Sequence, residues 1–80
     1  SEFSPEEVEL LAEMEHERWV EERARQRFVY GSTRDSKKRT HPSLVPYNDL
    51  SEEEKDKDRI PVRGIPSFLA KARFQVYRSM

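Results

Sequence analysis

The stretch Ser4–Arg27, with the sequence SPEEVELLAEMEHERWVEERARQR, carries most of the information about the architecture of this 80-residue chain. Ser4 is a favourable N-cap, Pro5 suits the first helical position, and Glu7 is placed to complete a capping box. Glutamates gather at the start of the stretch and arginines at its end, which is the order that the helix dipole favours. The stretch therefore predicts a long helix from Pro5 to Arg27.

Ionisable residues interrupt the apolar face of this predicted helix. The face consists of apolar side chains at helical spacing, namely Val8, Leu11, Ala12, Trp19 and Ala24. Glu15, His16 and Arg23 fall on or beside it, and such groups either pair with buried partners or line a cleft. We expect Glu15 and His16 to be capped or exposed at the rim of the core. Arg23 can reach a loop carbonyl, an acidic partner or a ligand phosphate, because its planar guanidinium carries several donors.

The composition limits how the chain can build a core. Hydrophobic residues make up 34% of the sequence and charged residues 39%. A chain of this size forms one domain, which buries only about 60% of the surface that its unfolded form exposes. Large aromatic side chains must therefore supply much of the buried area. The candidates are Trp19, Phe28, Tyr30, Tyr47, Phe68, Phe74 and Tyr77.

The same composition also bears on location and partners. The chain has no cysteine, which excludes disulfides and thiolate metal sites and fits a reducing, cytoplasmic location. No apolar run approaches the roughly 20 residues that cross a bilayer, so we expect no membrane insertion. The formal net charge of -1 gives no general attraction to nucleic acid.

The region after residue 50 predicts a helix that starts twice. Ser51 and Glu54 form a second capping box, which begins a short helix. A restart is expected at Asp58-Arg59-Ile60-Pro61, because Pro61 fits only the first turn of a helix. Asp58 is then expected to satisfy free amides between the two helices. Arg59 is expected to reach a carboxylate or carbonyl across the loop.

The remaining residues predict a kinked helix and a strand. Val62, Ile65, Leu69 and Ala72 repeat at helical spacing and should pack on the first helix, with Phe68 alongside. Pro66 removes one backbone hydrogen bond, so we expect a kink or a fresh start near it. Phe74-Gln75-Val76-Tyr77 alternates as a strand, and its expected partner is Phe28-Val29-Tyr30. The predicted fold is mainly α, with a long N-terminal helix packed on a kinked C-terminal helix, a proline-rich loop and a small β-ribbon.

The proline-rich loop mixes aromatic rings with cations. Its two parts are Phe28-Val29-Tyr30-Gly31 and Lys37-Lys38-Arg39-Thr40-His41-Pro42-Ser43-Leu44-Val45-Pro46-Tyr47. The prolines hold the residues before them extended, so the loop has few conformations. Cationic donors beside tyrosine rings can grip an anion while a flat ring stacks. Equally, the prolines and tyrosines can simply pin a connection onto two helices.

A search for catalytic motifs finds none that is complete. His16-Glu17-Arg18-Trp19-Val20 begins like the zinc-protease helix, but Val20 stands where the second metal-binding histidine must be. Ser43 has no nucleophile elbow, and the only two glycines, Gly31 and Gly64, form no phosphate-binding loop. We therefore expect neither an enzyme nor a metal site, and no cofactor.

Taken in order, the motifs resemble the ryanodine-receptor-type repeat, or RyR domain. They are Leu11-Ala12, His16, Trp19, Glu22-Arg23, Tyr30-Gly31, Lys38, Thr40-His41-Pro42, Leu44-Val45-Pro46-Tyr47, Leu50, Glu54-Lys55, Asp58-Arg59 and Val62-Arg63. The resemblance covers nearly everything from Leu10 to Tyr77, and the bacterial or phage single-copy type is the more similar. We expect residues 1–4 to be a tag or linker remnant and residues 5–78 to be a single RyR-type domain excised from a longer protein.

The resemblance implies a noncatalytic module. The family occurs as tandem pairs on the cytoplasmic part of calcium-release channels and as single bacterial copies, some attached to nucleotide-binding or potassium-transport regulatory domains. Bacterial members are proposed to sense nucleotide-derived molecules. Three departures stand out: Phe28-Val29 replaces the usual Trp-Thr, Ser43 a common cysteine, and Glu15 a common aliphatic residue. The change at Phe28 keeps an aromatic surface but removes an indole donor.

Two functions remain open from the sequence. The first is sensing of a small anionic, nucleotide-like ligand between the first helix and the loop. Its expected binding residues are Trp19, Arg23, Tyr30, Lys38, Arg39, His41, Tyr47 and Arg59. The second is a protein-interaction or tandem-packing role, in which the same loop docks a neighbouring domain of the parent protein. An open cleft beside Trp19 favours the ligand, whereas a closed aromatic core favours docking. Duplex nucleic acid is not expected, because glutamate-rich helices flank the basic loop.

Overall fold

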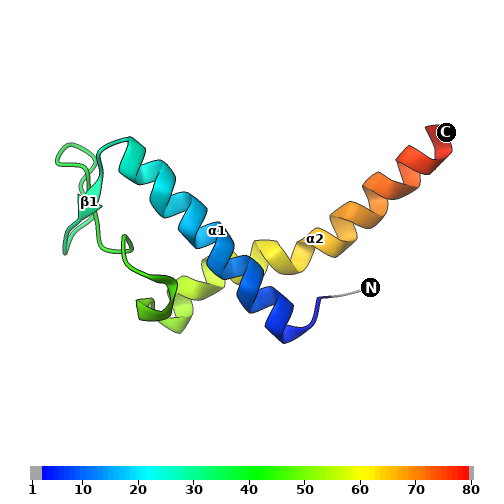
Figure 1. Cartoon of the computed structure of the whole chain (residues 1–80), viewed down its shortest axis with the longest axis horizontal. Coiled ribbons are helices and arrows are strands. Elements are labelled where there is room, and N and C mark those ends of the chain that lie inside the picture. The colour runs from blue at the N-terminus through cyan, green and yellow to red at the C-terminus, as the bar shows by residue number, and fades with distance from the viewer. Residues whose placement is uncertain (1–2, 80) are drawn as a thin grey trace.

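A computed structural model describes the backbone of residues 3–79 and the side chains of residues 3–69 and of Lys71. In chain order the elements are α1 (Pro5–Arg25), β1 (Val29–Tyr30), β2 (Thr40–His41), the short 3-10 helix η1 (Tyr47–Asp49) and α2 (Glu52–Ser79). Figure 1 shows α1 and α2 crossing near the middle of the molecule, with the loop region at one end. The mainly α prediction is confirmed.

Helix α1 begins as its capping box predicts. The backbone N–H of Glu7 donates to Ser4 Oγ at 3.2 Å, and the backbone N–H of Ser4 donates to Glu7 Oε1 at 2.7 Å. The helix ends at Arg25, two residues before the predicted end, and Gln26 is its C-cap. Arg27 follows with a φ of 67°, in the left-handed region, and this conformation turns the chain out of the helix.

The β-ribbon exists, but its predicted partner strand was wrong. Strand β1 pairs in parallel with β2, so that Val29 lies opposite Thr40 and Tyr30 opposite His41. Residues 74–77, the predicted partner, belong instead to α2. Four alternating residues are a weak strand signal, and extending an existing helix costs far less free energy than starting a new element.

Helix α2 is one continuous helix, so the predicted break before Pro61 was wrong. Its start is confirmed, because the backbone N–H of Glu54 donates to Ser51 Oγ at 3.1 Å. Pro61 and Pro66 both lie inside it. Each removes one backbone hydrogen-bond donor, but neither ends the helix, so of the kink or fresh start predicted near Pro66 the fresh start was wrong.

The core is small and lies where α1, η1 and α2 meet. Its buried apolar residues are Val8, Ala12, Tyr47 and Val62. Four residues expected in the core are instead exposed: Ala24, Tyr30 by 60%, Phe68 by 71% and Leu69 by 47%. Trp19, Phe28, Leu11 and Ile65 are half-buried. The side chains of Ala72, Phe74 and Tyr77 lie outside the described residues.

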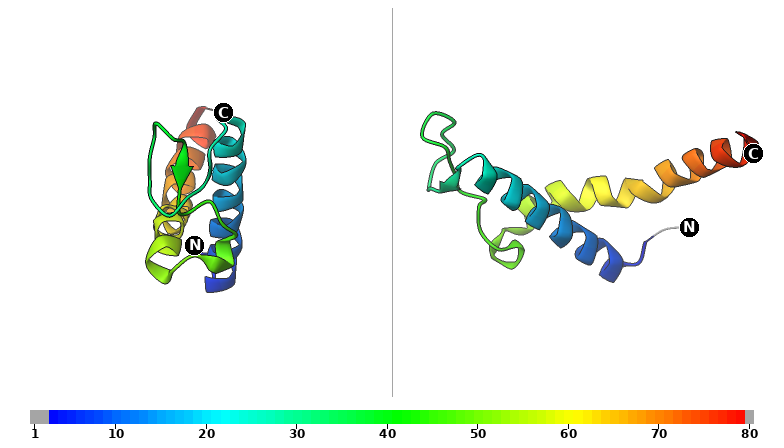
Figure 2. Two further views of the ribbon diagram at one scale, coloured as in Figure 1. Left: turned by 90° about the vertical axis from the view of Figure 1, so that its left-hand side faces the viewer. Right: turned by 45° about the horizontal axis from the view of Figure 1, so that its top comes forward.

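The two ends of α2 differ in their surroundings. Figure 2 shows the first half of α2 beside α1, and the second half projecting away from the rest of the chain. The helical spacing of Phe68 and Leu69 predicted that they pack on α1. They are exposed instead, because they lie on the part of α2 that extends beyond α1. In the part of the chain that the structure describes, neither helix has the length and apolar character needed to span a bilayer.

Candidate functional site

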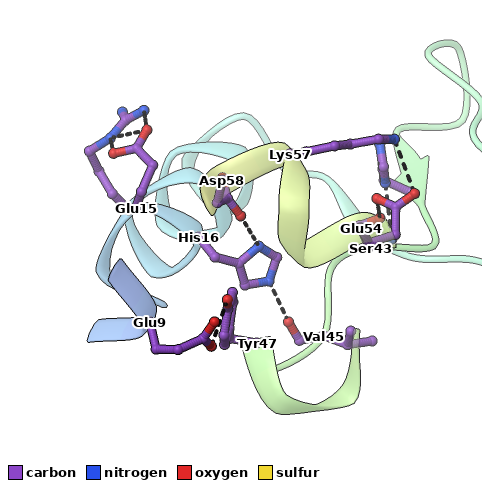
Figure 3. A network of polar contacts seen from close by, with 11 residues as sticks. Glu9, Glu15, His16, Ser43, Val45, Tyr47, Glu54, Lys57 and Asp58 are labelled. Carbon is purple, nitrogen blue, oxygen red and sulfur yellow. Dashed lines mark hydrogen bonds and ion pairs between the residues drawn. The ribbon is translucent and has the colours of Figure 1, made fainter. Parts of the chain in front are cut away.

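His16 is buried at the point where three segments converge. Its side chain is only 4% exposed, and Nε2 lies 2.7 Å from the carbonyl oxygen of Val45. Because a carbonyl only accepts, Nε2 carries the hydrogen and donates it. Nδ1 faces the Asp58 carboxylate at 3.9 Å (Figure 3). Of the two alternatives expected for His16, exposure at the rim was wrong and capping is observed, because a carbonyl of the loop and a carboxylate of α2 are its partners.

Aromatic rings surround this histidine. The ring of Trp19 stacks on His16 with centroids 5.7 Å apart, and the ring of Tyr47 lies tilted at 6.1 Å. Trp19 also meets the edge of His41, at 5.0 Å between centroids. His16 thus joins the core to the aromatic residues of the loop.

Asp58 does not cap a helix, because α2 runs through it without a break. Its half-buried carboxyl faces His16 instead. Burial raises the pKa of Asp58 above its ordinary 3.8, the charges of Glu15 and Glu54 raise it further, and His16 opposes the rise. Asp58 therefore connects α2 to α1 rather than closing a helix end.

Arg59 joins α2 to α1, and Tyr47 joins η1 to the same glutamate of α1. The Arg59 guanidinium donates to Glu9 of α1, and it also contacts Glu52 at 2.9 Å and Asp56 at 3.2 Å. The Tyr47 hydroxyl donates to Glu9 Oε2 at 3.1 Å. The hydrogen bond from Arg59 holds the pKa of Glu9 below its ordinary 4.5. As predicted, Arg59 reaches a carboxylate, but across the helix pair rather than across the loop.

Glu15 lies at the surface of α1, where it pairs with Arg18. The guanidinium of Arg18 donates to both oxygens of this carboxylate, at 2.6 Å in the shortest contact. These hydrogen bonds lower the pKa of Glu15. A neighbouring arginine one turn along the helix thus accounts for the carboxylate that interrupts the apolar face.

A pocket of about 290 Å³ opens between α1, the loop and the first turns of α2. Its lining consists of His16, Trp19, Arg23, Phe28, Arg34, Ser36, His41, Ser43, Leu50, Glu54, Lys57 and Asp58. Three of the predicted binding residues line it: Trp19, Arg23 and His41. Trp19 therefore borders an open space and not a closed aromatic core.

Two arginines give the pocket its cationic side. The Arg23 guanidinium lies 5.9 Å from the Trp19 ring centroid and 5.2 Å from that of Phe28, and it donates to Gln26 Oε1 at 2.7 Å. Arg34 comes from the loop. Among the described side chains, neither arginine forms an ion pair with a carboxylate. Both therefore have donors available for an anion.

The opposite wall of the pocket is acidic but largely paired. Lys57 contacts Glu54 at 3.0 Å, and the hydroxyl of Ser43 donates to the same carboxylate at 3.3 Å (Figure 3). The hydrogen bond from Lys57 lowers the pKa of Glu54. Only Asp58, which faces His16, adds a second carboxylate to this wall.

His41 presents a neutral donor to the pocket. The backbone N–H of Ser43 donates to His41 Nδ1 at 3.0 Å, so the ring hydrogen resides on Nε2. Burial lowers the pKa of His41 below its ordinary 6.5, and the nearby charge of Arg34 lowers it further. The imidazole is therefore uncharged at neutral pH and can donate one hydrogen bond.

The other predicted binding residues lie outside this lining. Tyr30 is exposed on β1, and Lys38 is exposed in the loop. The backbone N–H groups of Lys37 and Lys38 both donate to Asp35 Oδ1, which shapes the turn that carries them. Arg39 donates to the carbonyl of Gln26 at 3.1 Å and so ties the loop to the end of α1. Arg59 joins α2 to α1, and Tyr47 joins η1 to α1.

Sequence reasoning missed the part of the pocket that α2 supplies. Glu54, Lys57 and Asp58 stand at positions i, i+3 and i+4, so one face of a helix carries all three. That spacing could have grouped them, had the helix been predicted as continuous. Arg34 could be recognised as a cation of the loop, but nothing in the sequence indicated that it lines the same pocket as Trp19. No cluster of metal-binding side chains is present in the described residues.

The structure is that of a small, mainly helical domain with an open pocket beside Trp19. A family model for the RyR domain matches residues 2–78, which is nearly the whole chain. The chain belongs to the RyR domain family, a family of noncatalytic repeat domains.

Proposed function

We propose that this domain is a recognition module that binds a small anionic ligand of the nucleotide kind in the pocket beside Trp19. The observation that carries the proposal is that Trp19 borders an open pocket of about 290 Å³. This volume lies just below the range of most ligand sites, about 300–1,000 Å³, so it suits only a compact molecule. A duplex cannot enter it.

Each side of the pocket suits one part of such a ligand. The guanidiniums of Arg23 and Arg34 would bind a phosphate group, since both have donors free of carboxylate partners among the described residues. Trp19 and Phe28 offer flat apolar surface to a ring. The neutral His41 would donate from Nε2 to a phosphoryl or carbonyl oxygen without adding charge.

The charge balance of the pocket favours a ligand with few negative charges. Three cations, Arg23, Arg34 and Lys57, face two carboxylates, Glu54 and Asp58. Because Lys57 is already engaged with Glu54, the surplus positive charge is small. A single phosphate is therefore a better match than a polyphosphate, which would meet the two carboxylates.

Thermal-shift and calorimetric titrations with mononucleotides, cyclic nucleotides and a short DNA duplex test this function. A ligand at about 100 times its Kd should stabilise the fold by roughly 2.7 kcal/mol. Arg34→Gln should weaken the binding of the small ligand, because it removes a pocket cation from the exposed loop. Lys38→Gln is the matched control, since Lys38 is a cation of the same loop outside the pocket.

Two results would contradict the proposal. One is stronger, salt-sensitive binding of the duplex than of every small ligand. The other is equal loss of binding in Arg34→Gln and Lys38→Gln, which would move recognition from the pocket to the loop surface.

A protein-docking role is the second candidate, and the exposed ribbon favours it. Val29 and Tyr30 on β1 are each 60% exposed, so each face of the strand presents one apolar side chain. A neighbouring domain of a parent protein could cover them. In that case no small ligand would shift the melting temperature, while Tyr30→Ala would weaken binding of the neighbouring domain.

A further inference from the structure

The apolar stripe of α2 continues past the end of its contact with α1. Val62 is buried in that contact, at 4% exposed, and Ile65 is half-buried one turn later. Phe68 and Leu69 follow at helical spacing, but they are 71% and 47% exposed. In Figure 1 and in the right-hand view of Figure 2, the second half of α2 extends beyond α1 and away from the loop. The apolar stripe of α2 is therefore uncovered at Phe68 and Leu69.

The charge of this segment restricts what can fill that position. From residue 59 to residue 80 the sequence contains five cations and no aspartate or glutamate, the cations being Arg59, Arg63, Lys71, Arg73 and Arg78. Two such helices packed on each other would bring like charges together, which destabilises a helix pair. The partner surface should accordingly be apolar at its centre and acidic at its rim.

The outer face of α1 has this character. Leu10 and Met14 are 58% and 54% exposed, whereas Val8 and Ala12, on the core side of the same helix, are buried. Leu10 and Met14 stand four residues apart and therefore lie together on the outer face of α1. Glutamates flank them at positions 6, 13, 17 and 21. Among the described side chains Glu6, Glu13 and Glu17 have no ion-pair partner, and Glu21 only approaches Arg25 at 4.0 Å.

The shape of the chain also indicates missing contacts. Its radius of gyration is 16.0 Å, whereas a compact domain of this length has about 12 Å. The buried apolar residues among those described are only Val8, Ala12, Tyr47 and Val62. A chain of this composition gains stability most readily by covering its remaining apolar surface with a partner.

We propose that the second half of α2, from Ile65 to Lys71, docks on the outer face of α1 in a second copy of this chain. Phe68 and Leu69 pack against Leu10 and Met14, and the cations of α2 meet the flanking glutamates. Each copy has both surfaces, so a two-fold axis gives two identical contacts and closes the assembly as a dimer. This surface is separate from the pocket and does not depend on its ligand.

Sedimentation equilibrium of the 80-residue chain over a range of concentrations tests the proposal. The expected result is a reversible monomer–dimer equilibrium. Phe68→Asp should weaken association by at least about tenfold, as truncation of an interface hot spot does. Phe68 is already exposed in the single chain, so the variant should keep its helical circular dichroism, and Lys37→Glu in the distant loop is the control for a change of charge.

A charge swap makes the test specific for the two surfaces. Arg63→Glu with Lys71→Glu should weaken the dimer, and so should Glu13→Lys with Glu17→Lys. The chain with all four substitutions should dimerise again, because complementarity is restored with reversed signs. A monomer at every concentration would overturn the proposal, and so would a dimer that Phe68→Asp and both charge reversals leave unchanged.

Discussion

At the scale of single residues, His16 has the largest structural consequences. One imidazole donates to the Val45 carbonyl, faces Asp58 and stacks on Trp19, and so connects α1, the loop and α2. The sequence shows only that a polar residue interrupts an apolar face. Its role follows from partners that are distant along the chain.

His16→Ala should lower the free energy of unfolding by about 2–4 kcal/mol, because it opens a cavity and leaves the Val45 carbonyl without its donor. Chemical denaturation followed by circular dichroism measures the change. Lys37→Ala is the control, since the Lys37 side chain is exposed in the loop and its replacement should matter by less than about 0.5 kcal/mol. Equal effects of the two substitutions would show that His16 is not a structural centre.

Glu9 gives the domain a measurable dependence on pH. The hydrogen bond from Arg59 lowers the pKa of Glu9 in the folded state below the ordinary 4.5. Its contribution to stability is therefore complete above about pH 4.5 and disappears as the pH falls through the lowered pKa.

The comparison with Glu9→Gln isolates this effect. Glu15 and Glu54 also have lowered pKa values, but neither contacts Arg59, so their losses are common to both proteins and cancel. The wild-type chain should be more stable than Glu9→Gln at neutral pH, and the difference should shrink in acid. Urea denaturation of both proteins, in steps of about half a pH unit, measures the difference in stability. A difference that is constant between about pH 3 and 7, or that grows in acid, would contradict the ion pair between Glu9 and Arg59.

At the scale of elements, the close approach of β1 and β2 depends on Gly31. A Cβ atom at this position would lie 2.6 Å from Thr40 Cβ and 2.9 Å from its Cγ2, which is closer than atoms can pack. The glycine follows β1 directly, so any larger residue must push the two strands apart.

Gly31→Ala should therefore destabilise the domain by about 1–3 kcal/mol, the range for overpacking. Gly64→Ala is a control of opposite sign: it lies inside α2 with nothing within 4 Å of the added atom, so alanine should stabilise by roughly 0.5–1 kcal/mol. Thermal unfolding of both variants gives the answer. If Gly31→Ala melts at or above the wild-type temperature, the strands do not lie as described.

The secondary structure was predictable wherever it depends on neighbouring residues. The capping box of Ser4 and Glu7, and the amide of Glu54 on Ser51, join residues three apart and could be recognised directly. The predicted break of α2 at Pro61 failed because a proline lowers the stability of a helix without preventing it where packing compensates. Val62, buried against α1 beside that proline, supplies such packing.

At the scale of the whole molecule, the two long helices give an extended shape. The chain measures 49 by 26 by 14 Å along its principal axes. Small-angle X-ray scattering of Phe68→Asp, the variant expected to remain monomeric, should give a radius of gyration near 16 Å. A value near about 12 Å, typical of a compact domain of this length, would mean that α2 folds back on the chain.

Local chemistry along the chain by itself determined a capped first helix, a second helix start at Ser51, a basic loop with two prolines and the lack of a complete catalytic motif. These features rest on contacts within a few residues or on composition. The tertiary structure decided the parallel pairing of β1 with β2, the partners of His16, and the meeting of Trp19, Arg34 and Lys57 around one pocket. These three features depend on contacts between residues that are distant in sequence, such as His16 and Val45, which are 29 residues apart. Such contacts form because the whole chain packs together, and no local preference specifies them.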